Sequence, residues 1–433
     1  MEIFESYNVG EHCYLVNVNF SRKESLNACL DELKSLVFSA DLVSVGESVI
    51  SRKYPDPKFF VGRGKLDELK VDVCSCEANL VIFNHALSPS QERNLEEVLE
   101  CKVITRTRLI LEIFSIRAQT HEGALQVELA RLNYASTRLV KSWTHLERQK
   151  GGIGVRGGPG ETQLELDRRM VRDRISLVES RLERVSKQRA LGRNSRKRSN
   201  IPTVAIVGYT NAGKSTLFNQ LTGADVMVKD QLFATLDPTL RKVHIPRLGD
   251  VVFSDTVGFI RNLPHSLVEA FCSTLEEAVE ADLLLHVIDV SDVNYLEYME
   301  QVNIVLSQIG ADNKPIINVF NKIDLVEGLN AVAKKVRVDS SKDIYLSVRE
   351  NDGISLLKEE VAHFFHDVWV RGKLHLRVDQ GKIRAELYEL EVISSEEILE
   401  DGSFLLEVIM SQIDLERICV DNTLDINEVF SQQ

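Results

Sequence analysis

The fold is decided by residues 203–217, which read Thr-Val-Ala-Ile-Val-Gly-Tyr-Thr-Asn-Ala-Gly-Lys-Ser-Thr-Leu. An apolar, β-branched run at 204–207 leads into the spacing G-x-x-x-x-G-K-S at 208–215, and a helical pattern follows. In this order the backbone N–H groups of the loop and the N-terminus of the helix can bind phosphate oxygens. The stretch therefore predicts a phosphate-binding loop between a strand and a helix. The alternative is a chance occurrence of the pattern in a turn.

Three further motifs follow the loop in the order that a nucleotide switch requires. Residues 233–239, Phe-Ala-Thr-Leu-Asp-Pro-Thr, stand where a first switch segment belongs, and Thr235 could place its hydroxyl on Mg²⁺. A strand at 250–254 then ends in Asp255-Thr256-Val257-Gly258, a D-x-x-G motif. There Asp255 would hold the water shell of Mg²⁺, and the Gly258 N–H would meet a γ-phosphate.

A base-binding motif follows the apolar run 316–320 and reads Asn321-Lys322-Ile323-Asp324. The Asp324 carboxylate can accept protons from N1 and N2 of guanine, which adenine does not offer. Asn321 would brace the loop and Lys322 would lie over the base. Ser347, after a strand that ends at Leu346, would close the base pocket. Together the four motifs predict a guanine-specific GTP hydrolase with GTP as substrate and GDP as product.

Within this site we expect Lys214, at the β- and γ-phosphates, to act in catalysis with Thr235 and Gly258. Ser215 and Thr235 are the expected Mg²⁺ ligands. The nucleotide-binding residues are expected to be Gly208, Tyr209, Thr210, Asn211, Ala212, Gly213, Lys214, Ser215, Phe233, Ala234, Thr235, Leu236, Asp237, Asp255, Thr256, Val257, Gly258, Asn321, Lys322, Ile323, Asp324, Ser347, Val348 and Arg349.

Two positions in the site are unusual. Phe259 follows the D-x-x-G motif where many GTPases place a water-orienting Gln, and an aromatic ring cannot polarise water. Intrinsic hydrolysis is therefore expected to be slow and to need a partner. Asn211 resembles the Asn of potassium-assisted GTPases, which leaves K⁺ stimulation as an open alternative.

Composition indicates a folded protein of several domains. The 433 residues exceed one ordinary domain, and an apolar fraction of 44% with a charged fraction of 27% is typical of globular proteins. Seven scattered cysteines favour reduced thiols. The acidic N-terminus does not resemble a signal peptide, and no apolar run reaches the ~18 residues of a membrane span. We therefore expect a cytoplasmic protein without stable membrane insertion.

The net charge of −13 is unevenly distributed. Residues 168–198 contain twelve Lys or Arg residues and three acidic ones. The chain after Gly372 contains fourteen acidic residues and five basic ones. Heptad-like apolar patterns at 125–146 and 164–185 predict an antiparallel helical hairpin, and the glycine-rich stretch 151–160 predicts its tip. The tip could be a flexible connection. Alternatively, the tip with the basic helix could enter a narrow anionic site such as ribosomal RNA.

The expected architecture is α/β, with four domains. Strands at 13–20, 79–83 and 102–105 alternate with helices at 25–37, 64–76 and 88–100 in a mostly parallel sheet. Gly62-Arg63-Gly64-Lys65 could bind phosphate or form a tight turn. The expected domains are an N-terminal α/β domain at 1–120, the helical hairpin at 121–195, a GTP-binding domain at 201–370 and a small C-terminal α+β domain at 371–433. Residues 191–200 are the expected linker.

The chain resembles the HflX family of bacterial ribosome-associated P-loop GTPases over almost its whole length. The matching stretches are Tyr-Pro-Asp-Pro-Lys-Phe-Phe-Val-Gly-Arg-Gly-Lys at 54–65, Gly-Gly-Ile-Gly-Val-Arg-Gly-Gly-Pro-Gly-Glu-Thr-Gln-Leu-Glu-Leu-Asp-Arg-Arg at 151–169, and the motifs at 208–215, 233–239 and 255–259. The resemblance implies binding to RNA and protein of the large ribosomal subunit. It also implies that the hairpin reaches toward the peptidyl transferase region and that stalled ribosomes are split into subunits. Two glycines before Pro159, where the family has one, and Ser-Val-Arg at 347–349 depart from the pattern.

Two other functions compete with ribosome splitting. The chain could be a nucleotide-regulated adaptor for a protein partner such as a membrane protease, which would place it peripherally at a membrane. The N-terminal domain could also remodel RNA with ATP, an idea that depends on residues 62–65 alone. The cluster of cations in the hairpin favours the ribosome, and we expect a monomer.

Overall fold

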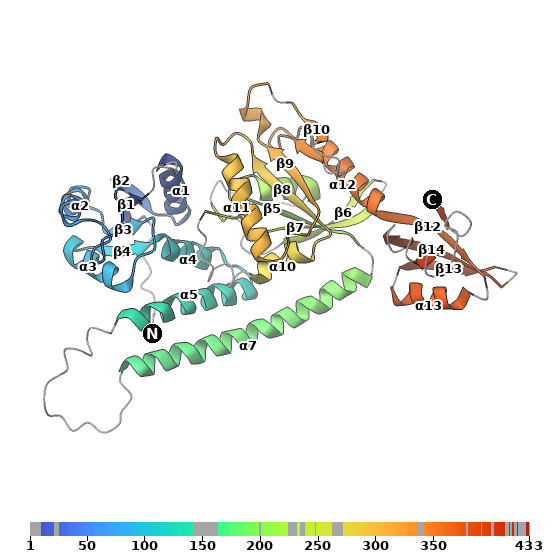
Figure 1. Cartoon of the computed structure of the whole chain (residues 1–433), viewed down its shortest axis with the longest axis horizontal. Helices are drawn as coiled ribbons and strands as arrows, with labels where there is room; N and C mark the ends of the chain where they lie inside the picture. The colour runs from blue at the N-terminus through green and yellow to red at the C-terminus, as the bar shows by residue number, and fades with distance from the viewer. Residues whose placement is uncertain are drawn as a thin grey trace. The chain divides into compact units, whose positions relative to one another are not determined.

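The fold is described from a computed structural model of the whole chain (Figure 1). The residues that the structure describes are 10–20, 26–142, 163–198, 201–223, 232–233, 239–246, 248–261, 272–328, 330–335, 342–377, 380–390, 392–399, 402–411, 415, 418–419, 422 and 430–432. The glycine-rich tip at 151–160 lies outside them, as do Ala234, Thr235, Leu236 and Asp237.

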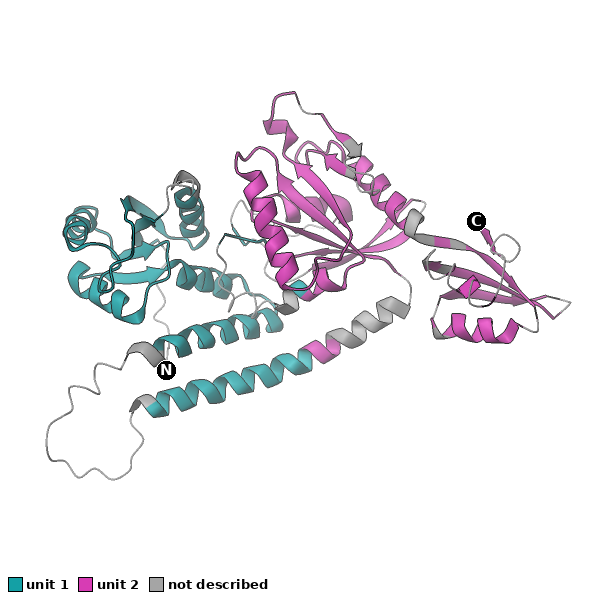
Figure 2. Ribbon diagram, in the orientation of Figure 1, with its two compact units in different colours: residues 1–185, 227–237, 257–275 teal, residues 186–226, 238–256, 276–433 magenta. Residues whose placement is uncertain are grey.

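The chain forms two compact units, coloured separately in Figure 2. One unit contains residues 1–185 together with 227–237 and 257–275. The other contains residues 186–226, 238–256 and 276–433. Two short segments from the middle of the chain therefore group with the N-terminal elements. The four-domain division predicted from the sequence stays a prediction.

The N-terminal sheet has four parallel strands in the order β2-β1-β3-β4. Its elements are β1 (His12–Asn19), α1 (Leu26–Ser39), β2 (Val43–Ser51), α2 (Arg63–Ser75), β3 (Leu80–Phe83), α3 (Pro89–Leu99), β4 (Lys102–Thr105) and α4 (Arg106–Arg117). The predicted start of α3 is confirmed: Pro89 follows the N-cap Ser88, which forms a capping box with Gln91. The strand β2 and the helix α4 were not predicted.

The hairpin helices are α5 (His121–Ser142) and α7 (Gln163–Arg198). Their predicted apolar seam is confirmed: buried Leu125, Leu132, Val171 and Val178 form one cluster, with Leu129, Ile175 and Leu182 packed against it. Helix α7 continues through Arg198, so most of the stretch expected as a linker is helical. Its four cations, Arg193, Arg196, Lys197 and Arg198, have good helix propensity, which offsets the less favourable Gly192, Asn194 and Ser195.

The GTPase sheet has seven strands in the order β10-β11-β9-β8-β5-β7-β6. Its elements are β5 (Thr203–Gly208), α8 (Lys214–Thr222), β6 (Thr239–Ile245), β7 (Gly249–Asp255), α10 (Cys272–Glu280), β8 (Leu283–Asp289), α11 (Tyr295–Gln308), β9 (Ile316–Asn321), β10 (Val332–Lys335), β11 (Lys342–Tyr345) and α12 (Ile354–Val368). Strands β5, β7, β8, β9 and β11 are parallel, so the motifs that follow β5, β7 and β9, and Ser347 after β11, emerge at one edge of the sheet. The antiparallel outer strands β6 and β10 were not predicted.

The C-terminal sheet is antiparallel, with the order β13-β14-β12-β15. Its elements are β12 (Trp369–Leu376), α13 (Gly381–Glu389), β13 (Ile393–Ile398), β14 (Phe404–Ser411) and β15 (Phe430–Gln432). The sequence pattern predicts a strand at 373–378, a helix at 382–390 and strands at 391–398 and 403–410; this order is confirmed by β12, α13, β13 and β14, and β15 was not predicted. Among the described residues, no helix is both long enough and apolar enough to cross a membrane.

Candidate functional site

The phosphate loop lies between the buried strand β5 and the helix α8. Two of its glycines are required by their surroundings. A Cβ on Gly208 (φ 147°) would come within 2.3 Å of the Val287 carbonyl oxygen. A Cβ on Gly213 (φ 94°) would come equally close, 2.3 Å, to Nδ2 of Asn321. The motif glycines therefore allow the loop to pass close to the neighbouring strand and to the base-binding loop.

Lys214 is buried at the start of α8, where its Nζ donates a hydrogen bond to the Tyr209 carbonyl oxygen at 2.6 Å. Burial lowers the pKa of Lys214 to about 8, while the charge of Asp255 acts in the opposite direction. Ser215 follows it, and its hydroxyl donates to Oδ2 of Asp255 at 2.7 Å. The structure thus brings the loop hydroxyl and the D-x-x-G carboxylate, both hard oxygen donors, into direct contact.

Asn321 connects the two ends of the site. Its Nδ2 donates to the Ala212 carbonyl oxygen at 2.9 Å, and its Oδ1 accepts from the Val348 N–H at 3.1 Å. The side chain is 3% exposed, so both hydrogen bonds are shielded from water. The Asn321 side-chain amide therefore links the phosphate loop to residues 347–348, as expected for a residue that braces the base-binding loop.

Asp324 and Ser347 also lie together. The Ser347 hydroxyl donates to Oδ1 of Asp324 at 2.6 Å and accepts from the Glu350 N–H at 3.2 Å. Ser347 is buried, whereas Asp324 is exposed in the short 3₁₀ turn η1 (Ile323–Leu325). The serine orients a carboxylate that remains accessible to a ligand.

The remaining predicted residues differ in exposure. Buried positions are Tyr209, Thr210, Ala212, Phe233, Thr256, Val257, Gly258, Ile323 and Val348, while Asn211 and Arg349 are exposed. Asn211 has φ 60°, a left-handed conformation that asparagine tolerates better than most residues. The glycine-rich turn before α2 differs from this site. Gly62 has φ −71°, whereas Gly213 has a positive φ, and Lys65 is exposed and forms an ion pair with Glu68, whereas Lys214 is buried.

Three residues near the site were not predicted from the sequence. Tyr298 of α11 stacks on Tyr209 with ring centroids 4.1 Å apart. His286, on β8, has a pKa lowered to about 4 by burial and by the charge of Lys214. Asp289 ends β8 and forms a 2.7 Å ion pair with Lys322. Of these, only Asp289 had a signal in the sequence: it is a carboxylate near the end of the apolar run 283–290, which predicts a buried strand, and a parallel strand of such a sheet ends beside the site.

Asp289→Asn is expected to weaken guanine nucleotide binding about fivefold, which corresponds to about 1 kcal/mol for a partly exposed ion pair. An asparagine can still accept from the Ser291 N–H, as Asp289 does at 3.1 Å, but it no longer holds the Lys322 ammonium by charge. Fluorescent GDP titration measures the change. Asp292→Asn is the control, because Asp292 caps Asn294 in the same loop and forms no described contact with Lys322. Equal losses in the two variants would contradict a specific role for Asp289.

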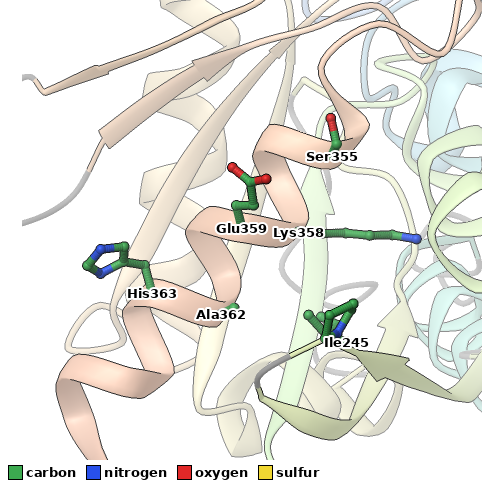
Figure 3. A pocket seen from close by; sticks show the side chains of 7 residues that line it. Ile245, Ser355, Lys358, Glu359, Ala362 and His363 are labelled. Atoms are coloured by element: carbon green, nitrogen blue, oxygen red, sulfur yellow. The ribbon is translucent and has the colours of Figure 1, made fainter.

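A separate pocket of about 650 Å³ lies between the end of β6 and α12 (Figure 3). Its lining residues are Ile245, Pro246, Ser355, Lys358, Glu359, Ala362 and His363. None of them belongs to the four nucleotide motifs. The pocket is therefore distinct from the candidate nucleotide site.

Family models match three consecutive parts of the chain. They are described as GTP-binding GTPase N-terminal at residues 27–115, GTP-binding GTPase Middle Region at residues 117–196 and 50S ribosome-binding GTPase at residues 203–322. The first two cover the N-terminal sheet and the hairpin. The third covers the phosphate loop, Asp255 and the start of the base motif.

Similar proteins match over nearly the whole length. The chain is 50% identical to GTPase HflX of Escherichia coli K12 over 417 residues, which are 96% of this chain and 97% of that protein. It is 46% identical to GTPase HflX of Magnetococcus marinus, over 87% of this chain and 88% of that protein. The crystal structure of a GTP-binding protein from Sulfolobus solfataricus in complex with GDP is 25% identical, with a TM-score of 0.43, over 82% of this chain and 98% of that one. The chain belongs to the HflX family of P-loop GTPases.

Proposed function

We propose that this GTPase binds the large ribosomal subunit in its GTP-bound state and splits or rescues stalled ribosomes. Hydrolysis, stimulated by the ribosome, then releases the protein. The family description for residues 203–322 names the 50S ribosome. The structural observation behind the proposal is that Arg172, Arg181 and Arg184 of α7 are exposed. None of them belongs to the seam that joins the two hairpin helices.

The nucleotide site supports the first part of this proposal. Lys214 and the loop N–H groups would hold the phosphates, and the Gly258 N–H would meet the γ-phosphate. Mg²⁺ fits the oxygen donors present, with Ser215 as ligand and Asp255 holding its water shell; Thr235 as second ligand lies outside the described residues. When bound, the ion would neutralise charge on the β- and γ-phosphates. Asp324, held by Ser347, would select guanine.

Slow intrinsic hydrolysis follows from the residue after the D-x-x-G motif. The Phe259 side chain is 3% exposed, so it is packed into the protein, and it carries no group that could orient a water molecule. A partner that orders the switch segments or supplies the missing polar group would accelerate the reaction. The ribosome is the partner that this proposal requires.

The hairpin supports the second part. Val171 and Val178 of α7 face α5, and Arg174 forms a 2.5 Å ion pair with Glu128 of α5. By contrast, Arg172, Arg181 and Arg184 are exposed on the same helix. Because these three side chains are exposed and are not part of the seam between α5 and α7, the stability of the hairpin does not require their charge. Exposed guanidinium groups along one helix are suited to the phosphates of folded RNA.

Ribosome binding is therefore expected to weaken steeply with salt, because each Lys or Arg that binds a phosphate releases counterions. Replacing Arg172, Arg181 and Arg184 by Gln should reduce the salt slope by about 1 for each phosphate that is no longer bound. Cosedimentation with 50S subunits in a nonhydrolysable GTP analogue, at several KCl concentrations, measures the slope. GDP affinity should stay unchanged in the same protein.

Glu179→Gln is the matched control, since it changes one exposed charge on α7 in the opposite sense. It should leave the affinity unchanged or raise it. If the triple variant kept the parental slope, the basic face of α7 would be only a solvated surface, and the proposal would lose its structural support.

The runner-up function is a nucleotide-regulated adaptor for a protein partner. Under that function the three arginines are dispensable, and GTP sets only the conformation. Cosedimentation separates the two, because an adaptor would not enter the ribosome pellet. Action on ribosomes also places the protein in the cytoplasm, and we propose that it works there as a monomer.

A further inference from the structure

Parts of both switch segments belong to the same compact unit as the N-terminal sheet. Leu232 directly precedes the expected first switch segment at 233–239, and Phe233 is the first residue of that segment. Arg261 follows the D-x-x-G glycine, Gly258, by three positions. Each of these described residues contacts the helices α1 or α4, more than a hundred positions away in sequence.

The first segment is held through its backbone and through one aromatic ring. The Leu232 N–H donates to Oγ of Ser39 at 2.8 Å, and that hydroxyl in turn donates to the Ser35 carbonyl oxygen at 2.7 Å. Next to it, the Phe233 ring packs edge-on against Phe114 of α4 with centroids 4.6 Å apart. Phe233 has φ 56°, which is uncommon for an aromatic residue. Both phenylalanines are buried, at 3% and 1% exposure, so this contact excludes water.

The second segment is held by a buried ion pair. Nη2 of Arg106 donates to Glu32 at 2.9 Å and also to the Arg261 carbonyl oxygen at 2.9 Å. Nη1 of Arg106 donates to Oδ1 of Asn84 at 3.0 Å, which fixes the guanidinium plane. The side chains of Arg106 and Glu32 are 8% and 9% exposed. Nε of Arg106 has no hydrogen-bond partner among the described residues, so the buried ion pair depends on the bonds that the two Nη atoms donate, and the switch backbone accepts one of them.

We propose that the N-terminal unit carries both switch segments as fixed attachments, so that the nucleotide state is transmitted into α1 and α4. Ser39 and Arg106 are the positioning residues of this connection. The inference uses the nucleotide site of the proposed function but requires no ribosome. It gives the N-terminal unit a role that its own sequence does not suggest: the unit responds to a γ-phosphate through the switch segments of the same chain.

The physical reason is linkage. A γ-phosphate held by the Gly258 N–H, with Thr235 as the expected ligand of its Mg²⁺, would fix the neighbouring residues 232–233 and 261. Because residues 232–233 are buried against α1 and α4 and residue 261 is half-buried there, fixing them would also stabilise the parts of these helices that contact them. The reciprocal effect follows: a change at Ser39 or Arg106 must alter the relative affinity for GTP and GDP, although neither residue would touch nucleotide.

Hydrogen exchange tests the connection in the full chain. With a nonhydrolysable GTP analogue in place of GDP, amides in the last turn of α1 and the first turns of α4 should exchange about fivefold more slowly. A factor of about five is at the low end of the range for allosteric coupling between two sites. Ser39→Ala and Arg106→Lys should each remove more than half of this difference. The lysine keeps a charge beside Glu32 but has a single nitrogen, whereas Arg106 uses Nη2 for Glu32 and the Arg261 carbonyl and Nη1 for Asn84. Both variants should also shift the ratio of GTP-analogue to GDP affinity.

Ser35→Ala is the matched control. Its hydroxyl donates to the Asp31 carbonyl oxygen one turn earlier in α1, and the Ser39 acceptor is the Ser35 backbone, which the substitution keeps. This variant should behave as the parent. The proposal is overturned if α1 and α4 exchange equally with both nucleotides while residues 255–261 respond, or if Ser39→Ala and Arg106→Lys retain the full difference. Failure of ribosome binding alone would leave these exchange data unaffected.

Discussion

Asp324→Asn is expected to weaken GTP binding at least about 100-fold, or about 3 kcal/mol, and to favour xanthine nucleotides. The carboxylate can accept from both N1 and N2 of guanine, whereas an amide presents one acceptor and one donor, a set that fits the xanthine edge. The loop itself should remain intact, because the Ser347 hydroxyl, 2.6 Å from Oδ1 of Asp324, can donate equally well to an asparagine oxygen. The substitution therefore changes recognition without removing the support for the side chain.

The measurement is a pair of titrations, with GDP and with xanthosine diphosphate, for parent and variant. Asp352→Asn serves as the control, because Asp352 is an exposed carboxylate whose backbone pairs with Ser347. It should bind GDP as the parent does. Parental GDP affinity in Asp324→Asn would show that the base lies elsewhere and that the N-K-x-D assignment is mistaken.

Local patterns in the sequence were sufficient for most of the secondary structure. The strand before Gly208, the helix after it and the seam from Leu125 to Leu132 are specified by residues close together in the chain, so periodicity predicts them. The start of α3, with Ser88 as the cap and Pro89 at the first helical position, is predictable for the same reason. The missed strand β2 has a different cause. It is a parallel edge strand with mostly exposed or half-buried residues, and it contains Gly46, so it lacks the apolar alternation that marks a strand.

Motif spacing also predicted which parts of the site would be neighbours, but not the contacts that hold them. The bond from Asn321 to Ala212 joins residues 109 positions apart, and the pair of Lys322 with Asp289 depends on β8 and β9 being adjacent. Such contacts are decided by strand order, which no local pattern contains. The connection from Ser39 to Leu232 spans 193 positions. A serine in an amphipathic helix gives no sign that its hydroxyl will hold a switch segment.

Shortening residues 151–160 to a tight turn is expected to abolish ribosome splitting while leaving nucleotide affinity unchanged. The hairpin should survive, because its stability comes from the seam around Val171 and Val178 and from the Arg174–Glu128 pair, all described residues of α5 and α7. The phosphate loop and the base-binding loop contain no residue of the tip. A loss confined to splitting would therefore assign the tip a mechanical role on the ribosome, separate from the switch.

Light scattering of 70S ribosomes with a nonhydrolysable GTP analogue measures this loss, because splitting separates the particle into lighter subunits without requiring hydrolysis. A second variant, Arg156→Gln, keeps the length of the tip but removes its positive charge. Comparing the two variants shows whether splitting depends on the length of the tip or on its charge. Since a connection between packed helices typically needs only a few residues, a glycine-rich tip of ten residues favours a role beyond closing the hairpin. If reach is what matters, Arg156→Gln splits ribosomes nearly as the parent does and only the shortened protein fails. Splitting at the parental rate by the shortened protein would reduce the tip to a linker and move the working surface to the exposed arginines of α7.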